Sequence, residues 1–376
     1  MYLKNIELKN FRNYKDLKVE FDKNLNIFLG HNAQGKTNLL ESIYITGMGK
    51  SFRTNKDEEM INFYSDFARV RAEVIEDNNE DEIEITYKKE GKIIKLDGIK
   101  LPRTIDLLET VYIVVFSPED LKIVKEGPDN RRRFLDRELC QIKPVYYSDL
   151  GNYKKVLKER NTLLRQENKD ENLYSVFNEA LAEYGIRIAD ERRKFTERLL
   201  SISKKIHSDI TSGSEFLNIT YESKISNKEE YLKTLSDNFE KDLYKGFTGF
   251  GPHKDDIKIE INDIDIRNFG SQGQQRTAAL SMKLAEKELI KQETGKNAVL
   301  LLDDVLSELD YSRQQYLIKA MEDVQVFLTA TEIDENLMKK LPPGPYFCRR
   351  ARKAWNSNNC AQAPRSRHRR GLWTTA

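Results

Sequence analysis

Residues 25–46 read LNIFLGHNAQGKTNLLESIYIT, and this stretch decides the fold. It begins with an apolar run over residues 25–29 that predicts a short buried strand. The run breaks at Gly30, and apolar residues at helical spacing return over residues 39–44. Between them lies G-x-x-x-x-G-K-T, the phosphate-binding spacing in the strand–loop–helix setting that it requires. The flanking strand and helix argue against a chance match in a glycine-containing turn.

The residue types in this loop suit the phosphates of a nucleotide. Glycines let backbone N–H groups converge on phosphate oxygens, and the helix N-terminus adds partial positive charge. Lys36 is expected to reach the β- and γ-phosphates, and the Thr37 hydroxyl is expected to ligate Mg²⁺. The predicted nucleotide-binding loop comprises Gly30, His31, Asn32, Ala33, Gln34, Gly35, Lys36, Thr37 and Asn38.

The composition favours a soluble protein of one or two domains. Charged residues make up 33% of the 376 residues, and the mean hydropathy is −0.68. No apolar run approaches the ~20 residues of a membrane span, and the N-terminus starts with a strand-like pattern instead of a signal peptide. The three cysteines show no zinc spacing and fit a reducing compartment, so we expect a cytoplasmic protein.

The net charge of +2 conceals a step near the C-terminus. From Leu341 onward there are seven Arg, one Lys and no Asp or Glu, so residues 1–340 carry a net charge of −6. We favour a non-native tail produced by a frame shift or vector read-through. A basic nucleic-acid-binding tail and an ordinary disordered terminus are the alternatives.

Alternating apolar residues predict strands at residues 2–10, 17–21, 68–74, 83–87 and 94–96, the later ones forming antiparallel hairpins. Residues 111–116 are apolar on both faces and predict a central strand of a covered sheet. After residue 245, strands are expected again at 257–261, 299–304 and 324–328, with a helix starting near residue 271.

Between about residues 130 and 245 the pattern is helical. Apolar residues spaced four, three and four apart from Phe177 to Ile206 predict one amphipathic helix of roughly 30 residues. Leu150, Tyr153, Leu157 and Leu164 suggest an antiparallel partner. Two interpretations remain open: helices packed on a core, or a coiled-coil-like arm that projects from the nucleotide domain.

Two carboxylates follow the buried strand near residue 300. Mg²⁺ needs a second hard oxygen ligand, commonly an Asp at the C-terminal end of an apolar strand, and Asp303 fits that description. Asp304 is then the predicted carboxylate that orients or activates the attacking water. The alternative is a pair of helix N-cap residues. The long separation from Lys36, the third predicted catalytic residue, indicates a nucleotide domain split by an insertion.

Residues 271–275, Ser-Gln-Gly-Gln-Gln, are polar and contain a glycine at an expected helix N-terminus. Such a helix end can bind an anion. Because one loop already cradles the phosphates within a chain, a second site makes sense if it caps the γ-phosphate held by a neighbouring molecule. A simple helix cap is the alternative.

Taken in order, these motifs resemble the ABC-type ATPases of DNA repair and chromosome maintenance, relatives of the SMC proteins. The matching stretches are a Walker A loop at Gly30–Asn38, a signature loop at Ser271–Gln275, a Walker B strand at Leu300–Asp304 and a D-loop at Ser307–Asp310. A closer resemblance, over residues 1 to about 340, is to the RecF family of bacterial recombination mediators. It includes four further stretches: Leu8–Tyr14, Gly49–Thr54, Phe116–Leu121 and Gly251–Asp256.

The resemblance implies an α/β fold: an ABC-type P-loop ATPase head, with a mixed sheet and an antiparallel β subdomain, plus an inserted helical arm. The implied domains are residues 1–122 for the first half of the head, 123–245 for the arm and 246–340 for the second half. Residues 341–376 form the tail.

The resemblance also implies a function. The family's proteins dimerise head-to-tail on ATP with Mg²⁺, bind duplex DNA near single-strand gaps, and help RecR and RecO to load RecA. Slow, DNA-stimulated hydrolysis would open the dimer, and the family is linked to replication restart and the SOS response. Matching positions add Arg12, Asn13, Ser271, Gly273 and Gln274 to the ATP site, and give Thr37 and Asp303 as metal ligands.

Three positions depart from the wider ABC pattern, and the departures fit weak turnover. No glutamine stands at residues 117–120, so Glu119 or Asp120 is expected to serve in place of the Q-loop Gln. Asp304 replaces the usual Glu. Thr329 or Thr331 stands where many relatives have a switch His.

Two other functions compete with a DNA-binding clamp: an ATPase subunit of another ABC-type machine, such as a transporter, and a small-molecule P-loop kinase. The helical insertion argues against a transporter subunit, and the Ser271 loop argues against a kinase. Because residues 1–340 are acidic, DNA binding would need a local basic patch. Candidates are Lys50, Arg53, Lys254 and Arg131–Arg133, with an ordinary solvated surface as the alternative.

Overall fold

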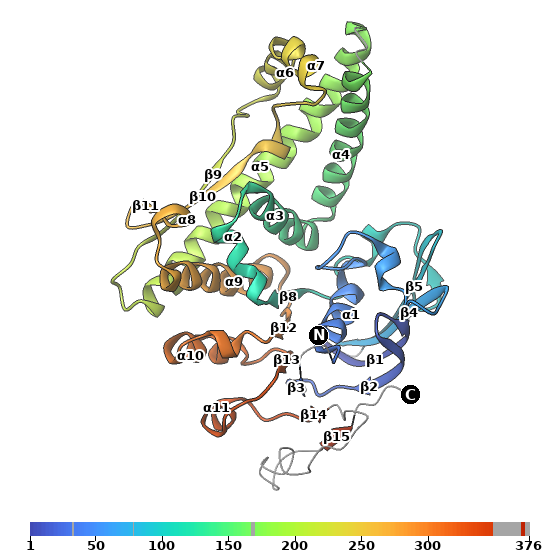
Figure 1. Ribbon diagram of the computed structural model, residues 1–376, viewed down its shortest axis with the longest axis vertical. Helices are drawn as coiled ribbons and strands as arrows, with labels where there is room; N and C mark the ends of the chain where they lie inside the picture. The colour runs from blue at the N-terminus through green and yellow to red at the C-terminus, as the bar shows by residue number, and fades with distance from the viewer. Residues whose placement is uncertain (32–33, 78, 167–169, 349–369, 373–376) are drawn as a thin grey trace. The chain divides into compact units, whose positions relative to one another are not determined.

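The computed structural model describes residues 1–31, 34–77, 79–166, 170–348 and 370–372 (Figure 1). Its contacts divide the chain into two compact units. The first unit comprises Met1–Pro118 and Ile290–Ala376, and the second unit comprises Glu119–Leu289. Residues 246–289, which the sequence assigned to the head, therefore group with the helical insertion. The division into functional domains stays a prediction.

A parallel sheet organises the first unit. Its strand order is β15-β14-β3-β13-β12-β8. The strands are β3 (Leu25–Leu29), β8 (Ile113–Phe116), β12 (Val299–Asp303), β13 (Val326–Ala330), β14 (Tyr346–Cys348) and β15 (Arg370–Leu372). The prediction that residues 111–116 form a central strand is wrong, because β8 lies at one edge of the described sheet. Its residues are buried on both faces, and burial of the two faces does not depend on the strand's place in the order.

The predicted tail begins with a strand of this sheet, since β14 pairs with β3. Residues 349–369 and 373–376 lie outside the described residues, so the origin of the tail stays a prediction. Two α-helices, α10 (Tyr311–Ala320) and α11 (Glu335–Lys340), and the 3₁₀ turn η5 (Leu306–Glu308) complete this part of the unit.

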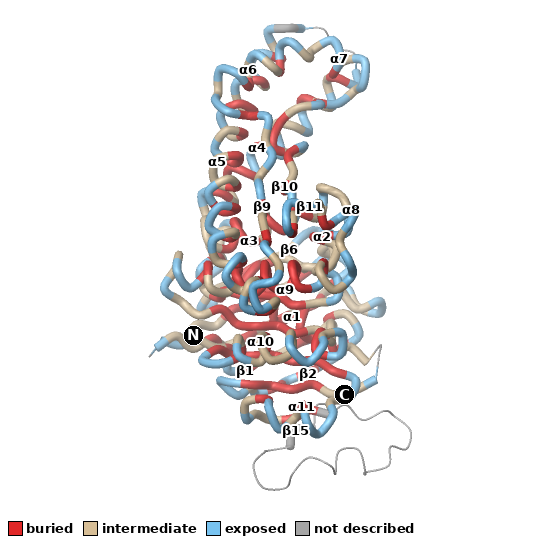
Figure 2. Tube along the Cα trace, turned by 90° about the vertical axis from the view of Figure 1, so that its left-hand side faces the viewer, coloured by how far each residue is buried: buried red, intermediate tan, exposed pale blue. Residues whose placement is uncertain are grey.

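The predicted hairpins are confirmed as a second, antiparallel sheet in the order β2-β1-β4-β5-β6-β7. Its strands are β1 (Tyr2–Phe11), β2 (Tyr14–Glu20), β4 (Phe67–Glu76), β5 (Asn79–Lys88), β6 (Gly91–Leu96) and β7 (Ile99–Lys100), with the 3₁₀ turns η1 (Asp57–Met60) and η2 (Thr104–Leu107). Helix α1 (Lys36–Met48) contacts strands of both sheets, so most of its residues are buried. Figure 2 colours the chain by the burial of each residue.

The second unit is mainly helical. Its helices are α2 (Leu121–Lys125), α3 (Pro128–Ile142), α4 (Pro144–Arg165), α5 (Glu171–Ile210), α6 (Lys228–Asp237), α7 (Phe239–Lys245), α8 (Ile266–Phe269) and α9 (Gln272–Thr294), the last turn of α9 belonging to the first unit. A small antiparallel sheet has the order β11-β10-β9, formed by β11 (Ile264–Asp265), β10 (Asp256–Ile261) and β9 (Leu217–Glu222). Two 3₁₀ turns are η3 (Pro118–Asp120), whose first residue belongs to the first unit, and η4 (Pro252–Lys254).

The predicted antiparallel helix pair is α4 and α5. Two side-chain hydrogen bonds show that the helices are antiparallel: Arg160 bonds Asn178, and Asp149, earlier in α4, bonds Arg187, later in α5. Helix α5 has 40 residues, longer than expected, because Asp170 caps its N-terminus before the apolar seam begins. Since α5 also packs against β9 and α6, the seam is shared with a local core. This favours the interpretation of helices packed on a core.

Candidate functional site

The phosphate loop leads into α1 through Gly35, which has a φ of 95°. A Cβ at this position would lie 2.6 Å and 2.8 Å from the side-chain amide atoms of Asn13, so a side chain here would be strained by the positive φ and would displace the Asn13 amide. The Tyr14 hydroxyl donates a hydrogen bond of 2.9 Å to the Gly35 carbonyl. The β1–β2 turn therefore braces the loop. Two predicted loop residues, Asn32 and Ala33, lie outside the described residues.

The loop lysine is held close to the two carboxylates. The Lys36 ammonium donates to the carbonyl oxygens of Gly30 and, at 3.3 Å, His31, and the residue is only 6% exposed. Burial lowers the pKa of Lys36, and the carboxylates of Asp304 and Asp303 oppose that shift. Lys36 is therefore close enough to both predicted carboxylates, Asp303 and Asp304, to interact with their charges.

Thr37 and Asp303 meet although they are 266 residues apart in the chain. The Thr37 hydroxyl donates to Asp303 Oδ1 at 3.1 Å. The two residues come close because α1 directly follows β3, and only β13 lies between β3 and β12 in the described sheet. Asp304 comes directly after β12 with a φ of 56°, which is uncommon for a residue other than glycine and is often found at functional sites. Burial raises the pKa of Asp304; the Lys36 ammonium opposes this rise and the Asp303 carboxylate reinforces it.

These residues suit a nucleotide with a magnesium ion. Thr37 and Asp303 offer the hard oxygen atoms that Mg²⁺ prefers. Because Thr37 gives its proton to Asp303, the lone pairs of the Thr37 oxygen can face a cation. In addition, the side-chain oxygen of Gln34 is buried and has no hydrogen-bond partner among the described residues, so the loop contains a polar group that a ligand or its water could satisfy.

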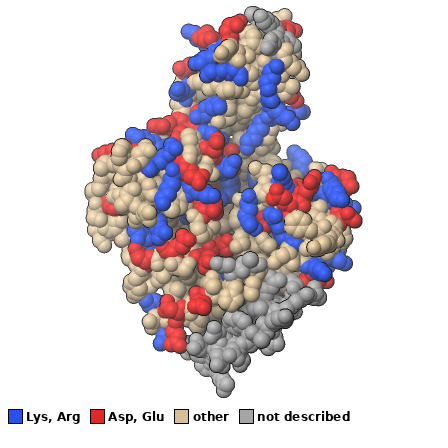
Figure 3. All heavy atoms as spheres, viewed as in Figure 1, with Lys and Arg blue, Asp and Glu red and all other residues tan. Residues whose placement is uncertain are grey.

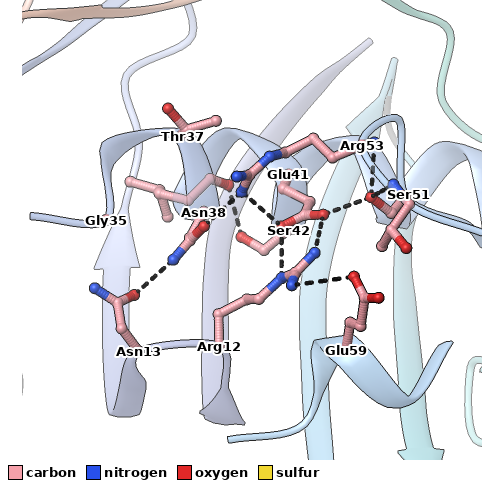
Figure 4. A network of polar contacts seen from close by, with 12 residues as sticks. Arg12, Asn13, Gly35, Thr37, Asn38, Glu41, Ser42, Ser51, Arg53 and Glu59 are labelled. Carbon is pink, nitrogen blue, oxygen red and sulfur yellow. Dashed lines mark hydrogen bonds and ion pairs between the residues drawn. The ribbon is translucent and has the colours of Figure 1, made fainter. Parts of the chain in front are cut away.

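Arg12 and Asn13, two predicted ATP contacts, belong to a polar network behind the loop (Figure 4). Arg12 Nε and Nη2 donate to the two carboxylate oxygens of Glu41 at 3.0 and 2.8 Å. Asn13 Oδ1 accepts a hydrogen bond of 2.9 Å from Asn38. In this structure both side chains therefore brace α1, and their contact with ATP stays a prediction.

Glu41 is the member of this network that the sequence did not reveal. It is fully buried in α1, and the Ser51 hydroxyl also donates to it. Arg53 approaches it at 3.5 Å and bonds Asn38 Oδ1 at 2.8 Å. The only signal in the sequence was a charged residue among apolar positions of a helix expected to be buried.

The predicted signature loop lies in the second unit and forms a reciprocal cap at the start of α9. Ser271 Oγ accepts from the Gln274 backbone N–H at 3.2 Å, and Gln274 Oε1 accepts from the Ser271 backbone N–H at 2.9 Å. The Gly273 carbonyl accepts from the Thr277 hydroxyl at 2.9 Å. The cap that we considered as an alternative is thus present. In this cap the Ser271 hydroxyl acts only as an acceptor, so its proton stays available to donate a further hydrogen bond.

The candidate basic patch is partly used in internal bonds. Arg131 is 3% exposed and bonds both carboxylate oxygens of Asp256 at 2.6 and 2.8 Å. Arg132 donates to the Asp255 carbonyl at 2.7 Å. Lys254 lies over the Phe247 ring. On the face in Figure 3, Lys and Arg are mixed with Asp and Glu, so the structure gives no support to Arg131 and Arg132 as DNA contacts.

The three departures from the ABC pattern have different surroundings. Glu119 lies in η3 and forms an ion pair with Lys122. Thr329 is buried in β13, and its hydroxyl donates to Asp303 Oδ1 at 2.7 Å. One of the two residues expected at the switch position is therefore bonded to Asp303, the predicted metal ligand. Among the described helices, none has the length and apolar character to cross a membrane.

Comparisons with known proteins agree on one family. The model of the AAA ATPase domain matches residues 1–325. The DNA replication and repair protein RecF of Clostridium kluyveri is 47% identical over 342 residues, covering 89% of this chain and 94% of that protein. RecF of Clostridium tetani is 46% identical over 351 residues, covering 91% of this chain and 95% of that protein.

Solved structures agree with this result. The recombination mediator protein RecF-ATP in the RecFOR pathway has a TM-score of 0.84 and 42% identity, covering 89% of this chain and 93% of that one. The Smc head domain of Pyrococcus furiosus, with a TM-score of 0.50 and 16% identity over 90% and 92% of the two chains, shows the shared fold alone. The predicted ABC-type ATPase fold is confirmed, and the chain belongs to the RecF family of DNA replication and repair proteins.

Proposed function

We propose that this chain is an ATP-switched DNA-binding protein of recombinational DNA repair. The observation that carries the proposal is the bond between Thr37 and Asp303, which joins the phosphate loop to the acidic strand end. The names of the relatives, a DNA replication and repair protein and a RecF-ATP structure in the RecFOR pathway, support it. We further expect the protein to act in the cytoplasm, and the isolated cysteines of the sequence support this location.

Each residue of the site has a role that follows from its chemistry. Lys36 would bind the β- and γ-phosphates of ATP, and Thr37 and Asp303 would hold Mg²⁺. The metal ion, when bound, neutralises phosphate charge and polarises the phosphoryl group. Asp304 would orient the attacking water with its carboxylate. The shorter Asp in place of the usual Glu supports slow hydrolysis.

The second half of the site would come from another copy of the chain. The cap at α9 orients the Ser271 hydroxyl while leaving its proton to donate. A γ-phosphate held by the partner's phosphate loop is the acceptor we propose for it, assisted by the N-terminus of α9, where Gly273 and Gln274 lie. Two chains would thus close head-to-tail over two ATP molecules, and DNA-stimulated hydrolysis would reopen them.

The finer biological roles follow from family membership. In the closed state the dimer would bind duplex DNA beside single-strand gaps. It would act with RecR and RecO to load the recombinase, with links to replication restart and the SOS response. The identity of 47% over most of the chain supports this extension.

Light scattering after gel filtration tests the proposal, by giving the mass in solution with and without ATP and then with linear duplex DNA. We expect monomers without ATP, dimers with ATP, and DNA retention only by the dimer. Ser271→Arg should abolish dimerisation, Lys36→Ala should abolish nucleotide binding, and Asp304→Asn should bind ATP and accumulate as dimer. Monomers that ignore ATP and phosphorylate a metabolite would contradict the proposal, and wild-type turnover by Asp304→Asn would remove Asp304 from its role.

A further inference from the structure

Thr329 connects the two carboxylates of the site from the neighbouring strand. It stands opposite Asp303 in the parallel register of β12 and β13, and it is fully buried. Its hydroxyl donates to Asp303 Oδ1 at 2.7 Å and accepts from the backbone N–H of Asp304 at 3.1 Å. One side chain therefore contacts the side chain of the first carboxylate and the backbone of the second.

The hydroxyl has one proton, so its acceptor can be assigned. The Leu302 carbonyl lies at 3.4 Å, whereas the charged Asp303 oxygen lies at 2.7 Å. Hydrogen bonds to ionised groups are shorter and stronger than those between neutral groups, so the Thr329 hydroxyl donates its hydrogen bond to the Asp303 carboxylate. Since Thr37 also donates to Oδ1, this oxygen is fixed between α1 and β13. Asp303 Oδ2 has no hydrogen-bond donor among the described residues.

The backbone at Asp304 depends on the same threonine. Asp304 has the left-handed φ of 56°, a conformation that persists only where the surroundings enforce it. Its N–H donates both to Thr329 Oγ1 at 3.1 Å and to the Thr329 carbonyl at 3.2 Å. Thr331, the other candidate for the switch position, contacts Asp304 through its backbone N–H, so its side chain is not required for that contact.

We propose that Thr329 is a positioning residue for the metal half of this ATP site: it orients the Asp303 carboxylate toward Thr37 and the cation. The inference rests on the proposed binding of ATP with Mg²⁺. Loss of a hydrogen-bond partner behind a metal ligand typically reduces metal affinity about 10- to 100-fold. A purely structural role would instead change the melting temperature without changing the dependence on Mg²⁺.

Three variants test the proposal. Thr329→Val keeps the shape and removes the hydroxyl, and Thr329→Ser keeps the hydroxyl. Thr46→Val is a matched control, because Thr46 is another fully buried threonine whose hydroxyl bonds only its own helix among the described residues. The measurements are retention of a fluorescent ATP analogue during Mg²⁺ titration, its affinity in EDTA, and the melting temperature. We expect Thr329→Val to raise the half-saturating Mg²⁺ concentration about 10- to 100-fold with unchanged affinity in EDTA. Thr329→Ser and Thr46→Val should resemble the wild type.

Two results would overturn the inference while leaving the proposed function intact: a wild-type Mg²⁺ requirement in Thr329→Val, or a defect in Thr329→Ser as large as that in Thr329→Val. The latter would place the effect in the methyl group. A wild-type chain that retains the analogue equally with Mg²⁺ and with EDTA would overturn the metal site itself, and the inference with it.

Discussion

Acidification should weaken the second unit through His253. Its Nδ1 bonds the Tyr153 hydroxyl at 2.7 Å and its Nε2 bonds the Thr248 carbonyl at 2.9 Å. A neutral ring suits both partners, because Nε2–H donates to the carbonyl and Nδ1 accepts from the hydroxyl. Burial lowers the pKa of His253 to about 4; the bond to Thr248 opposes this shift, and the nearby cations Lys254, Arg132 and Arg192 reinforce it.

The sign and size follow from linkage. With a folded pKa of about 4 against an ordinary value of 6.5, the unfolded chain takes up the proton first as the pH falls. The contribution to stability is therefore complete above pH 6.5 and is lost between pH 6.5 and 4. At 1.36 kcal/mol per pKa unit, the loss is about 3 kcal/mol.

Hydrogen exchange of the α4 and α5 amides, corrected for the intrinsic effect of pH on exchange, measures this loss locally in a chain of two units. His253→Gln serves as the comparison, since it keeps polar atoms but does not titrate. We expect the advantage of the wild type over the variant to shrink by about 3 kcal/mol between pH 7 and pH 4. Parallel loss of protection in both proteins over this range would refute the reasoning.

Two further predictions concern the surroundings of the phosphate loop. Gly35→Ala should reduce ATP retention, because the new Cβ is strained at a φ of 95° and would displace Asn13 from its bond to Asn38. Gly98→Ala is the control: at a φ of 77° with nothing within 4 Å, it should show only the strain of about 1–2 kcal/mol in a melting experiment and leave ATP retention unchanged. Glu41→Gln should lower the unfolding free energy by about 3 kcal/mol in denaturant titrations, because it removes the buried partner of Arg12. Its control, Glu59→Gln, changes a half-exposed carboxylate 3.9 Å from the same arginine and should cost less than about 1 kcal/mol; equal costs would contradict the assigned role of Glu41.

The features that the sequence predicted are those encoded locally. The phosphate loop, the strand before Asp303 and the hairpins depend on residues a few positions apart, and spacing and alternation reveal them directly. The meeting of Thr37 with Asp303 was also predictable, because the chemistry of a nucleotide site requires both.

The features that the sequence missed depend on partners that are distant in the chain. Nothing near Arg131 indicates that Asp256 will neutralise it, so a run of arginines suggested an exposed patch. Glu41 is recognisable as a buried anchor only once the β1–β2 turn and the Ser51 loop lie against α1. Likewise, the role of Thr329 depends on the register of β13 against β12, which composition does not fix.

The order of strands in the parallel sheet has a consequence for biosynthesis. The neighbours of β3 in the described sheet are β13 and β14, both from the far end of the chain. A ribosome therefore releases the phosphate loop long before it makes the strands that flank β3, and such long-range pairing is slow to form. A chain interrupted before residue 299 would carry Lys36 and Thr37 without Asp303. The proposed competence to bind magnesium and ATP would then arise only after β12 and β13 have been made, so that chains interrupted earlier could not act as partial switches.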